Sequence, residues 1–202
     1  MKQVKRLTVA DMNRANVPSR FWNVKLSEIP EHLEYRDKVR KYLEKMDEML
    51  ENGIGLFLYS DENSTGKTSI AVLALKQALR LRRTAYFEES GRLKAALIRA
   101  EEFEENIPIE RRIRTVDLLV LDDVGKEYRT ESGFAENTIE SVLRDRSQSM
   151  RLTIMTSNLK PNKIEQVYSA DLAALLRETM IPLRISGYDW RALKAEELRQ
   201  ML

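Results

Sequence analysis

The stretch Gly55-Leu56-Phe57-Leu58-Tyr59-Ser60-Asp61-Glu62-Asn63-Ser64-Thr65-Gly66-Lys67-Thr68 decides the fold. Its first five residues form a short apolar run, which is typical of a buried parallel strand. The Gly-Lys-Thr at its end matches a Walker A phosphate-binding loop, and a helical pattern over residues 67–81 follows. Such a loop curls backbone N–H groups around phosphate oxygens at the N-terminus of a helix. The stretch therefore predicts a nucleotide site between a strand and a helix.

The loop and the first turn after it supply the predicted contacts to ATP, namely Ser64, Thr65, Gly66, Lys67, Thr68 and Ser69. We expect Lys67 to neutralise the β- and γ-phosphates and the Thr68 hydroxyl to ligate Mg²⁺. Asp61 and Ser64 stand where the pattern usually has glycine. They add a charge and a Cβ where the backbone must approach an anion, so we expect reduced affinity or a reshaped loop.

A second motif follows at Leu118-Leu119-Val120-Leu121-Asp122-Asp123, where an apolar run ends in two acids. This is the form of a Walker B strand. Asp122 would bind Mg²⁺ directly or through water, and Asp123 would orient or deprotonate the attacking water. A strand that ends in a turn with two solvated acids is the alternative, and the Gly-Lys-Thr upstream makes it the weaker one.

Further polar residues follow in the order that a sensor-bearing ATPase requires. The apolar strand pattern over residues 152–156 runs into Asn158, which would contact the γ-phosphate or its water, unless it only turns the chain. Arg191 opens the last helical pattern and would reach the γ-phosphate, with a solvated arginine as the equal alternative. Arg144, Arg146 and Arg177 are candidates for an arginine finger that acts on a neighbouring subunit.

The rest of the chain alternates helical patterns with short apolar runs, at residues 84–87, 117–121, 152–156 and 181–185 after the first strand. This alternation predicts an α/β fold with a five-stranded parallel sheet between helices. Residues 32–51 have the spacing of one long amphipathic helix. We divide the chain into an N-terminal arm, 1–29, that packs on the core, and an ATPase domain, 30–202.

Composition limits the classes of protein that fit. Hydrophobic residues make up 43% of the 202, which is too apolar for a disordered chain. There is no cysteine and only one histidine, so neither a disulfide framework nor a Cys/His zinc site can form. Neither a signal core nor a membrane-length apolar run is present. We expect a cytoplasmic protein without membrane contact.

These motifs, together with Arg20-Phe21-Trp22-Asn23, Asp122-Asp123-Val124-Gly125-Lys126-Glu127 and Gly187-Tyr188-Asp189-Trp190-Arg191, resemble those of the DnaC/IstB family of AAA+ ATPases. The resemblance covers residues 18–192, and the chain is similar to short DnaC-like replication proteins. It implies the P-loop NTPase fold of AAA+ type, binding of ATP, Mg²⁺ and single-stranded DNA, and self-association into oligomers that load a replicative DNA helicase. Leu175 lies about where similar proteins carry the finger arginine, so either Arg177 substitutes for it or finger function is lost.

For DNA contact we predict basic residues that follow the second and third strands, namely Arg92, Lys94, Lys126 and Arg129, although a solvated surface explains any single one. Three other functions stay open. The first is an IstB-like ATPase that assists transposition on duplex DNA. The second is a degenerate AAA+ module that binds DNA or protein without turnover, and Asp61, Ser64 and Leu175 favour it. The third, a metabolic P-loop kinase, fits the sensor-like Asn158 and Arg191 less well.

Overall fold

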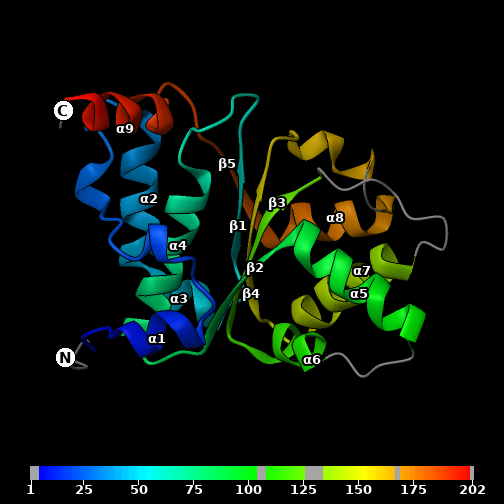
Figure 1. The fold of residues 1–202 in the computed structure, drawn as a ribbon. Helices are drawn as coiled ribbons and strands as arrows, with labels where there is room; N and C mark the ends of the chain where they lie inside the picture. The colour runs from blue at the N-terminus through cyan, green and yellow to red at the C-terminus, as the bar shows by residue number, and fades with distance from the viewer. Residues whose placement is uncertain (1–4, 104–107, 126–133, 167–168, 201–202) are drawn as a thin grey trace.

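The computed structural model describes residues 5–103, 108–125, 134–166 and 169–200. A parallel five-stranded sheet runs through its middle, in the order β2-β3-β4-β1-β5 (Figure 1). The strands are β1 (Gly55–Tyr59), β2 (Ala85–Glu89), β3 (Leu118–Val124), β4 (Leu152–Ser157) and β5 (Met180–Arg184). The predicted α/β fold is therefore confirmed, with strand ends displaced by a few residues at most.

Helices cover both faces of the sheet (Figure 1). On one face lie α1 (Val9–Arg14), α2 (Glu34–Glu44), α3 (Met46–Glu51), α4 (Lys67–Arg80) and α9 (Trp190–Arg199). On the other lie α5 (Ser90–Phe103), α6 (Pro108–Thr115), α7 (Phe134–Gln148) and α8 (Ala170–Thr179). Short 3-10 helices span Ser19–Phe21, Leu26–Glu28 and Pro161–Gln166.

Each face of the sheet has its own apolar core, because successive strand side chains point to opposite faces. On β1, Leu56 and Leu58 belong to the cluster shared with α1 to α4, whereas Phe57 belongs to the cluster shared with α5 to α8. Ile154 and Met155 on β4 divide in the same way. Strands buried on both faces read as continuous apolar runs, which is why they were visible in the sequence.

The arm packs on the first core and covers an edge of the sheet. The Phe87 N–H of edge strand β2 donates to the Ala15 carbonyl at 2.9 Å, and the Asn16 side-chain amide donates to the Phe87 carbonyl at 2.9 Å. Lys76 on α4 is buried, and its Nζ donates to the carbonyls of Trp22 at 2.7 Å and Val24 at 2.8 Å. The two bonds to Phe87 satisfy edge groups that would otherwise be open to pairing, and the two bonds from Lys76 fix the arm to α4.

Some elements differ from the prediction. The helix expected over residues 32–51 is two helices, which meet at Lys45. The break turns the chain so that Met46, Met49 and Leu50 are all buried. Helices α1, α6 and α8 lie in segments for which no helix was predicted, because they are short and their apolar spacing covers only two or three turns.

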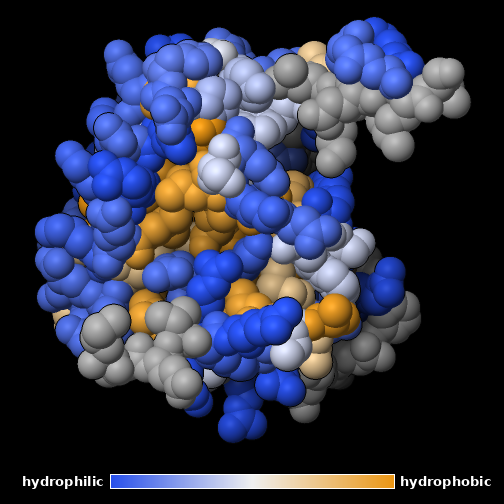
Figure 2. All heavy atoms as spheres, turned by 90° about the vertical axis from the view of Figure 1, so that its left-hand side faces the viewer, coloured by the Kyte–Doolittle hydropathy of each residue, from blue (hydrophilic) through white to orange (hydrophobic). Residues whose placement is uncertain are grey.

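Figure 2 views the face on which α1, α2 and α9 lie in Figure 1. Hydrophobic side chains gather in a hollow near its middle, and hydrophilic ones surround it. Phe21, Val24 and Leu26 of the arm are partly buried apolar residues that pack against the first core. Within the described ranges, no helix is both long and apolar enough to span a bilayer.

Candidate nucleotide site

The phosphate-binding loop joins β1 to α4 at the C-terminal edge of the sheet. Gly66 has φ = 91° and Ser64 has φ = 63°, so both adopt the left-handed backbone region. Lys67 is buried, and its Nζ donates to the Glu62 carbonyl at 3.2 Å and to the Thr65 hydroxyl at 3.3 Å. The loop thus forms without the usual glycine, although a residue with a Cβ costs roughly 1–2 kcal/mol in this backbone region.

Asp61, the other departure from the glycine pattern, takes part in two ion pairs. Its Oδ2 lies 3.3 Å from Lys160 Nζ, after β4, and 3.5 Å from Arg184 Nη2, at the end of β5. All three side chains are exposed, so each pair is weak and screened by salt. The negative charge that we expected near the phosphates is nevertheless balanced by two cations.

The Mg²⁺ ligands predicted from the sequence lie together. The Thr68 hydroxyl is 2.9 and 3.1 Å from the two carboxylate oxygens of Asp122. The Thr156 hydroxyl on β4 donates to Asp122 Oδ1 at 2.6 Å. Burial raises the pKa of Asp122, while the bonds from Thr156 and Thr68 lower it. A hydroxyl and a buried carboxylate at one point are oxygen ligands of the kind that Mg²⁺ prefers, so these residues fit the ion.

Asp123 sits on a β-bulge. The register between β3 and β4 shifts between Leu121 and Val124, and Asp123 has φ = 63°. Its N–H donates to the Thr156 hydroxyl at 2.9 Å. A bulge re-aims a side chain at a strand end. Asp122 is consequently buried whereas Asp123 is partly exposed, which suits a division between holding a metal and meeting a water.

Asn158 follows β4, the strand between β1 and β3. Its side-chain amide donates to the Asn63 side chain of the phosphate-binding loop at 3.3 Å. The carboxyl ends of the three parallel strands meet at one edge of the sheet, so the loop, the two acids and Asn158 converge there. The order of the three motifs along the chain predicted this meeting.

Helix α9 begins beside the loop. The Trp190 N–H donates to the Ser64 carbonyl at 3.0 Å, and Asp189 Oδ1 caps the helix by accepting from the N–H groups of Arg191 and Ala192 at 2.9 and 3.1 Å. The Arg191 side chain is exposed in the first turn. Ser69 lies in the first turn of α4, partly buried. The predicted phosphate contacts and Arg191 thus belong to neighbouring segments.

The three candidates for an arginine finger differ in how far their side chains are buried. Arg177 on α8 is exposed and pairs with Glu165 at 3.0 Å, and Arg144 on α7 is partly exposed and lies 3.8 Å from Glu140. Arg146 has an exposed fraction of 0%. A fully buried guanidinium cannot reach a neighbouring subunit, so Arg146 was wrongly counted among the finger candidates. Arg177 remains a prediction, and Leu175 packs against the second core.

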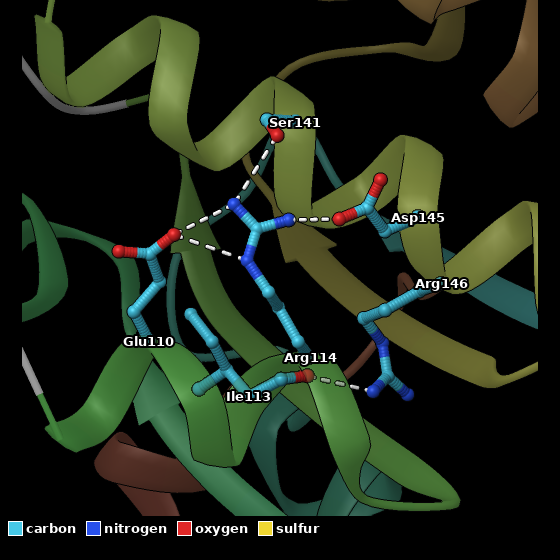
Figure 3. Close-up of polar contacts among 6 residues, drawn as sticks. All are labelled: Glu110, Ile113, Arg114, Ser141, Asp145 and Arg146. Atoms are coloured by element: carbon cyan, nitrogen blue, oxygen red, sulfur yellow. Dashed lines mark hydrogen bonds and ion pairs between the residues drawn. The ribbon is translucent and has the colours of Figure 1, made fainter.

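Arg146 is held by four hydrogen bonds, of which Figure 3 shows the one to the Ile113 carbonyl. Its guanidinium donates to the carbonyls of Ile113 at 2.7 Å, Val116 at 2.8 Å and Leu152 at 2.6 Å, and to the Thr153 hydroxyl at 2.9 Å. Burial lowers its pKa to about 9, so it stays cationic at neutral pH. Arg146 therefore joins the ends of α6, α7 and β4.

Arg114, one turn of α6 from Glu110, points the other way in Figure 3. It pairs with Glu110 at 2.6 Å, contacts the Ser141 hydroxyl at 3.2 Å and forms an ion pair with Asp145. These contacts use its guanidinium inside the molecule. The other two arginines of α6, Arg111 and Arg112, have exposed side chains.

The four residues predicted to contact DNA differ in their exposure to solvent. Arg92 is exposed at the start of α5. Lys94 has an exposed fraction of only 7%, because it lies on the α5 face that packs inward beside buried Leu93, so its predicted place on a DNA-facing surface is corrected. Lys126 and Arg129 lie outside the described residues.

Sequence reasoning missed two residues of the site. Thr156 was noted only as part of a strand, yet it contacts both acids of the Walker B motif. Trp190 was noted only within a motif, yet it touches the phosphate-binding loop. A threonine near the end of the strand expected beside Walker B was a usable signal for the first, whereas only the fold reveals the second.

A Walker A loop, a Walker B strand and a sensor strand that share one edge of a β2-β3-β4-β1-β5 parallel sheet define a P-loop NTPase of AAA+ type. The family model described as IstB-like ATP binding protein matches residues 49–181, more than half of the chain. The chain therefore belongs to this family of AAA+ ATPases, as the resemblance had suggested.

Solved structures share the fold. A crystal structure of the DnaC helicase loader matches with a TM-score of 0.73 at 20% identity, over 84% of this chain and 100% of that one. A crystal structure of DnaI matches with a TM-score of 0.68 at 21% identity, over 85% of this chain and 93% of that one. Replication initiator DnaA bound to AMPPCP and single-stranded DNA matches at 0.67 and 18% identity, over 88% and 55%. No curated protein matches the sequence.

Proposed function

We propose that this protein is an ATP-dependent DNA replication factor of the cytoplasm that binds ATP, Mg²⁺ and single-stranded DNA and loads a replicative helicase. One observation carries the proposal: an IstB-like ATP-binding chain has a fold that spans the whole of the DnaC helicase loader structure. The match supports the fold of a loader, and the site described above supports the chemistry. The partner helicase itself follows only from the loader role.

Each residue of the site has a task in this proposal. The loop backbone from Ser64 to Thr68 would hold the phosphates, and Thr68 with Asp122 would hold Mg²⁺, which neutralises developing phosphate charge when bound. Buried Lys67 would exchange its contacts to Glu62 and Thr65 for phosphate oxygens. Asp123 would orient the attacking water and take its proton. Asn158 and Arg191 would fix the γ-phosphate end.

The proposal also includes self-association. In AAA+ proteins an arginine from a neighbouring subunit stabilises the charge of the transition state. Arg177 is exposed and held to Glu165 at 3.0 Å, so it would be released to the neighbour's site in an oligomer. Turnover per subunit should then rise with protein concentration, and Arg177→Ala should abolish this rise without weakening ATP binding.

DNA contact is supported by a basic surface on α5 and α6. The Arg112 guanidinium lies 4.8 Å from the centre of the Tyr86 ring on β2. Arg92 is exposed in the first turn of α5, directly after the same strand, β2. Exposed Arg92 and Arg112 therefore flank one edge of the sheet, where a phosphate chain could bind.

The first experiment measures Mg²⁺-dependent ATP binding and turnover, with and without single-stranded DNA. The variants Lys67→Ala and Asp122→Asn should abolish turnover while the protein stays folded. Glu34→Gln, which removes an exposed carboxylate at the start of α2, is the control for nucleotide binding and turnover. A wild type that binds no ATP at millimolar concentration would instead favour the degenerate binding module.

A salt titration tests the DNA surface. Arg92→Ala and Arg112→Ala should weaken single-stranded DNA binding at all sequences, and each should reduce the log–log salt slope by about 0.7. Arg114 cannot serve as the charge control, because its guanidinium forms ion pairs inside the molecule. Lys38→Ala removes one exposed positive charge from α2 and is therefore the matched control. A slope unchanged in both variants would remove this surface from the proposal.

The IstB family match favours a second function, assistance to a transposase on duplex DNA. Competition between single-stranded and duplex DNA of the same sequence separates the two. A loader should prefer the single strand and promote assembly of a replicative helicase on circular single-stranded DNA. Preference for the duplex, with no effect on helicase assembly, would make the transposition helper the better assignment.

A further inference from the structure

The phosphate-binding loop contains a serine in a conformation that suits glycine. Ser64 has φ = 63°, beside Gly66 at φ = 91°. A side chain makes this backbone region unfavourable, so something must hold the residue there. The contact that does so comes from outside the loop, because the Trp190 N–H at the start of α9 donates to the Ser64 carbonyl at 3.0 Å.

The Trp190 ring contacts the same loop. A Cβ built on Gly66 would lie 2.6 Å from Trp190 Nε1 and 2.9 Å from Cδ1, so the indole edge lies directly against this glycine. Any side chain at Gly66 would displace the ring. The backbone N–H of Trp190 and its indole thus contact both left-handed residues of the loop.

Trp190 is itself held from two sides. Its ring packs edge-on against Tyr188, with 4.9 Å between the ring centres. On α2, buried Tyr35 belongs to the first core, against which both Tyr188 and Trp190 pack. The aromatic residues Tyr35, Tyr188 and Trp190, which we call the α9 clamp, therefore connect helix α2, helix α9 and the loop.

We propose that Trp190 is a positioning residue for nucleotide binding: through it, α9 holds Ser64 in the left-handed conformation that the usual loop obtains from glycine. The inference rests on the proposed ATP binding and adds a named residue outside the Walker motifs to it. The N–H groups of a phosphate-binding loop must all point inward. The clamp keeps Ser64 in the conformation that allows this.

A double-mutant cycle between residues 64 and 190 tests the inference. ATP affinity is measured for wild type, Trp190→Ala, Ser64→Gly and the double variant. Trp190→Ala keeps the backbone N–H but removes the ring that packs against Gly66 and Tyr188 and so fixes the start of α9 beside the loop. Without that ring the hydrogen bond to Ser64 should no longer be held in place, and ATP binding should weaken about tenfold, the size expected for one left-handed residue left unsupported. In the Ser64→Gly background the same substitution should change affinity by no more than about twofold, because glycine needs no support.

Controls separate this role from general stability. Trp190→Phe retains an aromatic ring and should stay within about threefold of the wild-type affinity. Arg82 also has a left-handed backbone, at φ = 63°, in another turn, so Arg82→Gly should not rescue Trp190→Ala. Should the alanine variant fail to fold, Trp190→Leu keeps apolar volume and replaces it in the cycle.

The outcomes are distinct. A wild type that binds no ATP contradicts the proposed function and this inference together. A wild type that binds ATP, with the effects of the two substitutions adding independently, overturns the role of Trp190 alone. Rescue by Ser64→Gly, and not by Arg82→Gly, supports it.

Discussion

The Thr156 hydroxyl on β4 donates a 2.6 Å hydrogen bond to Asp122 on β3 and accepts the N–H of Asp123 at 2.9 Å. One hydroxyl therefore fixes both acids of the Walker B motif. It also counteracts burial, which is the largest cause of the raised pKa of Asp122. The site depends on this threonine although it makes no contact that the Walker motifs would predict.

Thr156→Val keeps the shape of the side chain and removes the hydrogen bond. Because that bond lowers the pKa of Asp122, the substitution should raise this pKa further, and a protonated carboxyl binds Mg²⁺ poorly. The acid limb of Mg²⁺-dependent turnover should then move to higher pH. Thr156→Ser keeps a hydroxyl, so the acid limb of its pH–turnover profile should lie at the same pH as in the wild type. Identical pH profiles for valine and wild type would mean that Thr156 does not tune the acid.

The same pKa predicts a conflict between stability and function at Asp122. Its folded pKa lies above the unfolded value of 3.8, so its favourable contribution is present below pH 3.8 and is lost as pH rises through the folded pKa. At neutral pH and without metal, the buried carboxylate should therefore destabilise the fold. Asp122→Asn should unfold at a higher urea concentration than wild type in metal-free buffer while losing turnover. A lower midpoint would show that the carboxylate is net stabilising.

The ion pairs of Asp61 give a further prediction. Lys160→Ala and Arg184→Ala each leave a less balanced carboxylate beside the phosphates, and each should weaken ATP binding about two- to fivefold at low salt. All three groups are exposed, so the loss should shrink at high salt. In an Asp61→Gly background, Lys160→Ala and Arg184→Ala should each reduce ATP affinity by a smaller factor. A larger reduction in that background would mean that the two cations contact the nucleotide directly.

The strands and the three motifs could be predicted because apolar runs and motif spacing are local properties. The surroundings of Ser64 and Arg146 could not, because their partners come from distant parts of the chain. Arg146 stands beside Asp145 and close to Arg144 in the sequence, which reads as a solvated helix face. Only the fold brings the carbonyls of Ile113, Val116 and Leu152 around it.

Arg146 should accordingly matter for stability rather than for catalysis in a neighbouring subunit. Arg146→Met leaves three buried carbonyls and one hydroxyl without their donor, and should lower the free energy of unfolding by about 3–5 kcal/mol. Arg144→Met, at a partly exposed position on the same helix with only long contacts to Glu140 and Ser169, should change it by less than about 1 kcal/mol. Urea unfolding measures both. Near-equal midpoints for the two variants would contradict the role of the buried hydrogen bonds of Arg146.

Lys76 predicts how firmly the arm is held. Its buried ammonium, whose pKa burial lowers, donates to the carbonyls of Trp22 and Val24 from the middle of α4. Lys76→Met keeps the apolar stem and removes both bonds, so amide hydrogens of residues 17–24 should exchange faster, and the free energy of unfolding should fall by about 2–3 kcal/mol. Lys38→Met, on the exposed face of α2, should change neither. Within residues 5–29, the hydrogen bonds of the arm to the rest of the protein go to β2 and α4. ATP affinity should therefore fall only where the loss of stability reaches the phosphate-binding loop. A large loss of affinity in a variant that remains folded would place the arm in the nucleotide site itself.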